Sequence, residues 1–158
     1  MKAVTVKELK TELNERSHKE LLELCLRLSK FKKENKELLT YLVFESDDEQ
    51  GYINSVKSEM DEQFELINSN TYYYIKKSVR KILRRTKTYI RYSKNTETEI
   101  ELLLYFCNKL KSFSPSIHEN TVLTNIYTRE LASAKKKIVT LHEDLQFDYQ
   151  LSIDSLSV

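Results

Sequence analysis

The chain of 158 residues contains a single glycine, Gly51, and a single proline, Pro115. Average usage of about 7% Gly and 5% Pro would give about eleven and about eight. Glycine supplies the positive-φ conformations of tight turns, and proline is typical of loops. The Rossmann fingerprint, the Walker loop and the nucleophile elbow each require at least two glycines at fixed spacing. The composition therefore excludes these sites and argues against a fold with many hairpins.

Apolar residues recur at every third or fourth position along nearly the whole chain, which is the period of amphipathic helices. Helices are predicted over 6–15, 18–32, about 35–43, 48–68, 72–93, 97–113 and from about 117 to at least Leu145. The run Leu102–Cys107 is apolar on nearly all sides, which is typical of a helix surrounded by others. We therefore predict an all-α fold: an irregular antiparallel bundle of six to seven helices with Leu102–Cys107 at its centre.

Several predicted helices begin with a capping box, in which a hydroxyl side chain caps the helix and a Glu three residues later reaches back. The pairs are Thr5 with Glu8, Ser17 with Glu20, Thr96 with Glu99 and, as a fourth possibility, Ser116 with Glu119. The acidic break Ser46–Asp48 is expected to cap the helix that follows it.

The length fits one domain, which we predict over 1–145, followed by an acidic, serine-rich tail over 146–158 that is partly ordered at most. Charges interrupt the N-terminal segment where a signal peptide needs an apolar stretch, and no segment approaches a membrane span. We expect a cytoplasmic protein without a membrane span. Cys25 and Cys107 lie in apolar helical runs and are expected to be buried, reduced thiols.

No catalytic, cofactor or metal site is predicted. Glu15-Arg-Ser-His18 is the only Glu-x-x-His pattern, whereas a di-metal bundle needs two. His118-Glu and His142-Glu lack the second histidine of the zinc-protease helix. We expect no enzyme activity; the third and weakest hypothesis is an enzyme whose site is assembled from His18, His118 or His142.

One segment departs from the background of the chain. Residues 72–94 carry nine cations and no acid, and most of the cations gather opposite the apolar stripe of the predicted helix. Like charges four residues apart repel, which suggests a negative partner. The candidate polyanion-binding face consists of Lys76, Lys77, Arg80, Lys81, Arg84, Lys87, Arg91 and Lys94, with Tyr89 and Tyr92.

Two partners fit this basic face. The first is internal: the acidic block Glu45–Glu65, or the acidic tail, packed against it. The second is an external phosphate backbone or anionic membrane surface, with the tyrosines either stacking on bases or forming the rim of the core. Our first function hypothesis is a non-catalytic protein-interaction or scaffold protein, including self-association through a helix face. The alternative is a nucleic-acid-associated protein that uses the basic helix 72–94. No small-molecule substrate is evident.

Two resemblances bear on these hypotheses. Residues 6–13, VKELKTEL, are similar to the V-x-x-L-K-x-x-L start of SAP-type DNA-binding helix pairs, but the following turn, Ser17-His-Lys19, is shorter and lacks the glycine of that family. Any capped amphipathic helix can show this pattern, so no function is assigned from it. Through KELLELCLRLSKFKKENKELLTYLVF, YIKKSVRKILRRTKTYIRYSK and HEDLQFDYQ the chain resembles an uncharacterised bacterial family of small all-helical proteins. That resemblance implies a helical fold with a basic fifth helix. It does not imply any particular activity.

Overall fold

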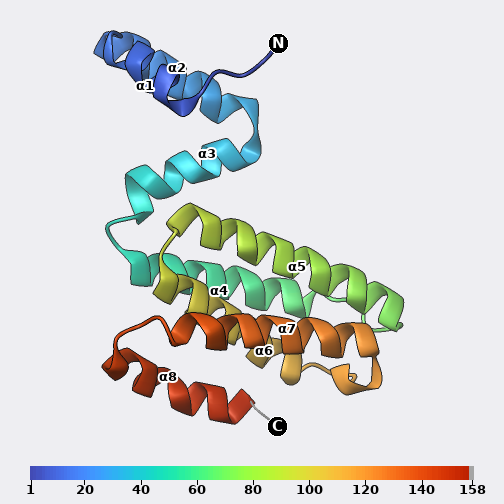
Figure 1. Cartoon of the computed structure of the whole chain (residues 1–158). Helices are drawn as coiled ribbons and strands as arrows, with labels where there is room; N and C mark the ends of the chain where they lie inside the picture. Colours follow the sequence, from blue (N-terminus) through green and yellow to red (C-terminus); the bar gives the residue numbers. More distant parts are fainter. Residues whose placement is uncertain (157–158) are drawn as a thin grey trace. The chain divides into compact units, whose positions relative to one another are not determined.

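The computed structural model describes residues 1–156, which form eight α-helices, one π-helical turn and one 3-10 turn, without a strand (Figure 1). The elements are α1 (Val6–Asn14), α2 (His18–Phe31), α3 (Lys33–Thr40), η1 (Tyr41–Glu45), α4 (Glu49–Glu65), α5 (Tyr72–Ser93), α6 (Thr96–Lys111), η2 (Ile117–Glu119), α7 (Thr121–Ile138) and α8 (Glu143–Leu156). The prediction of an all-α fold is confirmed. The number of helices is larger than the six to seven predicted.

The additional helix arises because the last predicted helix is two helices. α7 ends at Ile138, where consecutive β-branched residues weaken the helix and the Thr140 hydroxyl competes for its carbonyls. Both the backbone N–H and the hydroxyl of Thr140 donate to the carbonyl of Lys137, at 2.9 and 2.7 Å. The side chain of Gln146 then donates to the carbonyl of Leu141 at 2.7 Å, which closes the turn into α8.

The N-terminal helices begin as their capping boxes predict. The side chains of Thr5 and Ser17 accept hydrogen bonds from the N–H groups three residues on, and Glu8 and Glu20 reach back to them. Asp48 caps α4 by accepting from the N–H of Gly51 at 3.0 Å. Since a Cβ at Gly51 would lie 2.2 Å from Asp48 Oδ2, the chain's single glycine makes room for this cap.

The other two predicted capping boxes are wrong. α6 is capped by Asn95, whose side chain accepts from two backbone N–H groups, so the cap lies one residue before Thr96. Glu99 instead pairs with Lys137 at 3.0 Å. Ser116 accepts from the N–H of His118 and starts the 3-10 turn, while Asn120 caps α7.

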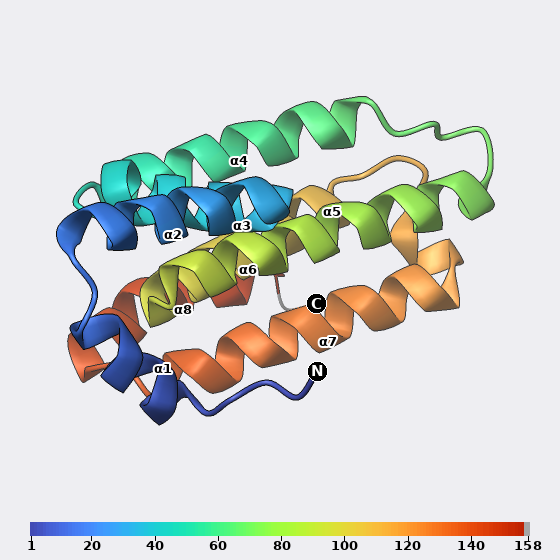
Figure 2. The same ribbon diagram turned by 90° about the horizontal axis from the view of Figure 1, so that it is seen from above.

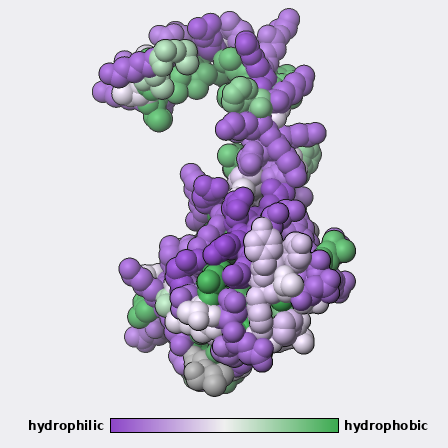
Figure 3. Space-filling view, turned by 90° about the vertical axis from the view of Figure 1, so that its right-hand side faces the viewer, coloured by the Kyte–Doolittle hydropathy of each residue, from purple (hydrophilic) through white to green (hydrophobic). Residues whose placement is uncertain are grey.

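The chain divides into two compact units, Met1–Phe44 and the segment from Glu45 onward, where the sequence pattern predicts one domain over 1–145. In the first unit α2 and α3 pack against each other, and the Asn35 side chain donates to the carbonyl of Leu28 at 2.9 Å across their turn. None of α1, α2 and α3 contains a buried residue. Hydrophobic side chains are visible at the surface of this unit (Figure 3).

The second unit is built around α6, which contacts α4, α5, α7 and α8 (Figures 1 and 2). Leu102, Phe106, Cys107 and Leu110 are 0% exposed, because α6 presents apolar residues in every direction. Ion pairs at 57/101 and 61/109 show that α4 and α6 run in the same direction. Neighbours in sequence, such as α4 and α5 or α6 and α7, run antiparallel.

Residues 146–156 belong to α8, where the sequence pattern predicts a partly ordered tail; positions 157 and 158 of that tail lie outside the described residues. α8 buries Ile153 and Leu156 and contacts α6 and α7. The Tyr127 hydroxyl donates to the carbonyl of Leu156, and Lys111 donates to the carbonyl of Ser155 at 2.9 Å. In the part of the chain that the structure describes, no helix combines the length and the apolar character that crossing a bilayer requires.

Candidate polyanion-binding groove

Helix α5 places its apolar and its charged residues on different sides. Ile75 and Val79 are 0% exposed and lie against the core. The cations Lys77, Arg80 and Arg84 are exposed on the other side of the helix. The chemistry of α5 therefore depends on which of its cations meet acidic side chains of neighbouring helices.

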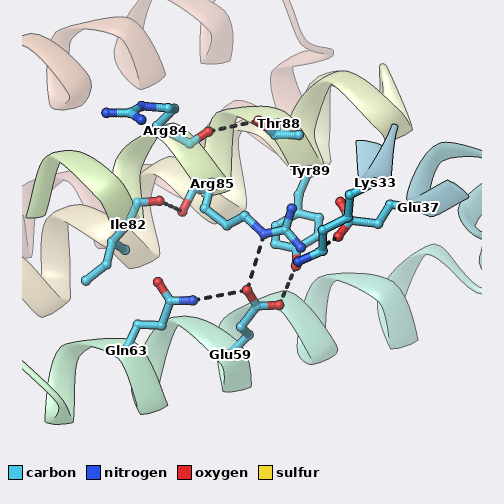
Figure 4. A network of polar contacts seen from close by, with 10 residues as sticks. Lys33, Glu37, Glu59, Gln63, Ile82, Arg84, Arg85, Thr88 and Tyr89 are labelled. Atoms are coloured by element: carbon cyan, nitrogen blue, oxygen red, sulfur yellow. Dashed lines mark hydrogen bonds and ion pairs between the residues drawn. The ribbon is translucent and has the colours of Figure 1, made fainter. Parts of the chain in front are cut away.

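The side of α5 that faces α4 carries a polar network (Figure 4). Arg85 pairs with Glu59 of α4 at 3.4 Å and lies 4.3 Å from the centre of the Tyr89 ring. Tyr89 donates its hydroxyl to the same carboxylate, and Gln63 donates to it at 3.2 Å. Arg84, the next residue of α5, points away from this network. Glu59 thus neutralises Arg85, which stands at the border of the predicted basic face.

Other acids of the block Glu45–Glu65 serve different partners. Asp61 pairs with Lys109 of α6 at 3.0 Å and accepts the hydroxyl of Tyr105 at 2.8 Å. Burial, with this hydrogen bond and the nearby carboxylate charge, raises the pKa of Tyr105 to about 12. Asp48 is used as the cap of α4. Internal neutralisation by this block therefore does not extend over the exposed cations of α5.

Those exposed cations form one wall of a groove that lies between α5 and α7, over α6. We call it the α5–α7 groove; its volume is about 850 Å³. One wall is a row of cations from α5, the cationic row, which consists of Arg80, Arg84, Lys87 and Arg91. Successive members are four, three and four residues apart, so they lie along one side of the helix over roughly 16 Å.

The opposite wall comes from α7 and contributes a fifth cation, Arg129, with Asn125 and Ser133. The floor consists of Leu83, Ile90, Leu103 and Ile126, which are 6%, 9%, 1% and 5% exposed. Of the described residues that line the groove, only Glu99 is acidic, and it pairs with Lys137. The lining therefore carries an excess of positive charge.

A buried carboxylate joins the two walls. Glu130 of α7 is 1% exposed. It binds Lys87 of α5 through Oε2 and its own neighbour Arg129 through Oε1, both at 2.8 Å. Both cations are themselves substantially exposed. Glu130 therefore holds one cation of each wall in place and leaves their remaining N–H donors available to a ligand.

Among the residues that the structure describes, the other three cations of the row have no acidic partner. Within residues 1–156 no carboxylate oxygen lies within 4.0 Å of Arg80, Arg84 or Arg91. Arg91 donates one hydrogen bond at 3.3 Å to the Thr88 hydroxyl. These three guanidinium groups lie on the same side of α5 as Lys87, and guanidinium groups bind phosphate in a bidentate manner.

The structure brings together four members of the predicted face and separates the others. Lys76, Lys77, Lys81 and Lys94 lie outside the groove lining. Tyr92 is buried, and Tyr89 is engaged with Glu59 and Arg85, so neither aromatic ring lines the groove. Sequence reasoning did not find Arg129 or Glu130, because both lie on a helix that is about forty residues away in sequence and carry no local signal.

Comparison with family models, with curated proteins and with solved structures gives no match. The resemblance to an uncharacterised helical family therefore stays an expectation. The groove must be interpreted from its own geometry and charge.

The groups that catalysis or metal binding would need lie apart. His118 and His142 flank opposite ends of α7, a helix of eighteen residues, or about 27 Å. The His142 ring nitrogen Nδ1 lies 3.5 Å from a carboxylate oxygen of Asp144, and both side chains are largely exposed. His18 is exposed at the start of α2. Among residues 1–156 no group of three or more His, Cys, Asp or Glu could hold a metal ion.

The two cysteines differ in environment. Cys107 is fully buried in α6, and burial together with the charge of Glu130 raises the pKa of its thiol to about 12. Cys25 is exposed on α2, so the expectation that both thiols are buried is wrong for Cys25. The reason is that the N-terminal unit has no core in α1–α3 to take up its apolar run.

Proposed function

We propose that this protein is a non-catalytic binding protein that holds the phosphate backbone of nucleic acid in the α5–α7 groove. The observation that carries the proposal is the cationic row: within residues 1–156, Arg80, Arg84 and Arg91 have no acidic partner, and they lie beside Lys87, with Arg129 on the opposite wall. Contacts from cations to phosphates supply most of the sequence-independent affinity of proteins for nucleic acids. The overall net charge of +2 is small, so such binding depends on this local concentration of charge.

Fluorescence anisotropy with labelled DNA and RNA oligonucleotides at about 50 mM salt tests this function. The triple variant Arg80→Gln, Arg84→Gln, Arg91→Gln removes the three unpaired groove cations. A control of equal charge change, Lys76→Gln, Lys77→Gln, Lys81→Gln, removes three cations of the same helix outside the groove lining. We expect the arginine variant to bind much more weakly and the lysine variant to retain most of the affinity. Absence of binding by the wild-type protein to any oligonucleotide would refute the proposal.

A second candidate function, protein interaction, is supported by the N-terminal unit. Its helices carry apolar stripes, yet Leu28 and Phe31 of α2 are 61% and 76% exposed. Exposed apolar patches of more than a few hundred Å² are typical of interaction surfaces. The two functions are compatible, because they use different units of the chain.

The interaction hypothesis is tested by sedimentation of the wild-type chain and of the variant Leu28→Glu, Phe31→Glu between about 1 and 100 µM. Self-association that the double variant abolishes would support it. Lys30→Glu, a charge change between the two positions, serves as the control. A wild-type chain that stays monomeric throughout would remove self-association from consideration.

A further inference from the structure

The width of the α5–α7 groove limits the ligand that can enter it. Lys87 of α5 and Arg129 of α7 bind opposite oxygens of the single carboxylate of Glu130, each at 2.8 Å. At this point the nitrogen atoms of the two walls are separated by no more than one carboxylate and two hydrogen bonds. Between Lys87 and Arg129 the side chains of the two walls are therefore only about one anionic group apart.

Two broader ligands do not fit between Lys87 and Arg129. An α-helix with its side chains is about 10–12 Å across, and an acidic amphipathic helix would also need an apolar floor to contact. The floor residues Leu83, Ile90 and Leu103 offer almost none, because they are only 6%, 9% and 1% exposed. A DNA duplex is wider still, since its major groove alone measures about 12 Å. A duplex also exposes only one side of each backbone to a protein, so one backbone cannot contact both walls of the groove at once.

The lining also lacks the groups that recognise bases. Single-strand binding proteins stack bases on aromatic side chains, and among the described residues no aromatic side chain lines the groove. Tyr89 lies on the side of α5 that faces α4, where it binds Glu59. The ligand therefore contacts guanidinium and ammonium groups, which favour phosphate. The apolar residues of the floor expose too little surface for a base to pack on them.

We infer that the α5–α7 groove binds a single extended chain of phosphates, threaded between α5 and α7 and contacted through its phosphates alone. The shared chemistry is a linear run of singly charged phosphates, supplied by single-stranded nucleic acid or by inorganic polyphosphate. This inference rests on the proposed function, which requires a nucleic-acid backbone, and it specifies the form of that backbone. Bases point away from the groove, so binding is independent of sequence.

Four probes test the inference: a ten-residue oligo(dT), an abasic oligomer of the same length, the duplex of the same length, and inorganic polyphosphate, which is titrated directly by calorimetry and also used as a competitor. We expect oligo(dT) and the abasic oligomer to bind within about threefold of each other, and the duplex to bind at least about tenfold more weakly. With up to five cations in contact and a slope of about −0.7 per phosphate, affinity for oligo(dT) falls about 100-fold between 50 and 200 mM salt. The variant Arg80→Gln, Arg84→Gln, Arg91→Gln should lose only about sevenfold over the same range, because two contacts remain.

The outcomes separate the inference from the proposed function. Duplex binding as tight as that of oligo(dT), or loss of binding by the abasic oligomer, would overturn the inference and leave nucleic-acid binding in place. Direct binding of polyphosphate without binding of any oligonucleotide would support a single phosphate chain and refute the nucleic-acid function. An equal change of the salt slope in Lys76→Gln, Lys77→Gln, Lys81→Gln would place the ligand on the whole basic face and overturn the groove assignment.

Discussion

Glu130 of α7 binds Lys87 of α5 at 2.8 Å, and the two partners differ sharply in exposure: the carboxylate side chain is 1% exposed and the lysine side chain 48%. Arg129, which binds the other carboxylate oxygen, is 64% exposed. Removing the cations leaves a buried charge without compensation, whereas removing the carboxylate leaves two cations in contact with water. The two perturbations should therefore have unequal effects.

We expect Lys87→Met, Arg129→Met to lower the free energy of unfolding by about 3 kcal/mol, the usual cost of leaving a buried ion unpaired. Glu130→Gln keeps the shape of the side chain and should cost about 1 kcal/mol. Urea denaturation followed by circular dichroism measures both values. A larger loss in Glu130→Gln than in the double variant would contradict this assignment.

The same carboxylate competes with a bound phosphate for Lys87 and Arg129. Glu130→Gln should therefore bind oligo(dT) more tightly than the wild-type chain, by roughly three- to tenfold at low salt, because the same five cations then act without a competing carboxylate. Lys87→Met, Arg129→Met should bind more weakly. Anisotropy titrations on the folded variants measure both, and weaker binding by Glu130→Gln would show that its carboxylate orients the cations more than it competes for them.

The network around Glu59 should affect stability and not ligand binding. Tyr89→Phe removes the hydroxyl that donates to Glu59 and leaves the Arg85 pair in place. Because a hydrogen bond to a charged group contributes about 1.5–3 kcal/mol, we expect a loss of about 2 kcal/mol in the free energy of unfolding. Oligonucleotide affinity should stay unchanged, since Tyr89 does not line the groove. A variant that keeps its stability but loses affinity would instead favour a role for Tyr89 in binding.

The capping residue of α6 differs between the sequence prediction and the structure. Asn95 accepts from the N–H groups of Glu97 and Thr98 at 2.8 and 3.3 Å, whereas Thr96 makes no cap. Asn95→Ala should therefore cost about 1 kcal/mol of stability, and Thr96→Ala a few tenths at most. Thermal or urea unfolding of the pair gives the comparison. The reverse order would restore the capping box of Thr96 with Glu99.

The Cys107 thiol should make stability fall in alkali. Its pKa is raised from 9.0 to about 12 in the folded chain, so the neutral thiol favours folding. This stabilisation is complete below pH 9 and is lost as pH rises from 9 toward 12, at about 1.4 kcal/mol per pH unit. Cys107→Ala lacks this dependence and costs about 1 kcal/mol at pH 7 through the lost packing. The wild-type chain should thus be the more stable at pH 7 and the less stable at pH 11.

Thiol reactivity provides an independent measurement on the same residue. In the native protein Cys25 is exposed and should react with a thiol reagent at pH 8, whereas Cys107 should react only after unfolding. One equivalent in buffer and two in denaturant is the expected result. Two equivalents in buffer would show that α6 is not buried in solution.

Local chemistry made several features of the fold predictable. The apolar period and the near-absence of glycine and proline indicate helices everywhere. The capping boxes of Thr5 and Ser17 are local interactions that need no tertiary partner, and they form as expected. The predictions for Thr96 and Ser116 are wrong because Asn95 and Asn120 cap the same helix ends, and choosing between adjacent caps depends on tertiary contacts such as Glu99 with Lys137.

One wall of the candidate site can be predicted from the sequence and the other cannot, because the first depends on neighbouring residues and the second on tertiary contacts. The sequence by itself determines that α5 has a basic side, since charges three and four residues apart must share a face. Which cations remain without acidic partners depends on distant residues: Glu59 of α4 binds Arg85, and Glu130 of α7 binds Lys87. The second wall, with Arg129, exists only because α7 packs on α6 beside α5. Helical period and caps are properties of neighbouring residues, whereas a groove is a property of helices brought together by a shared core.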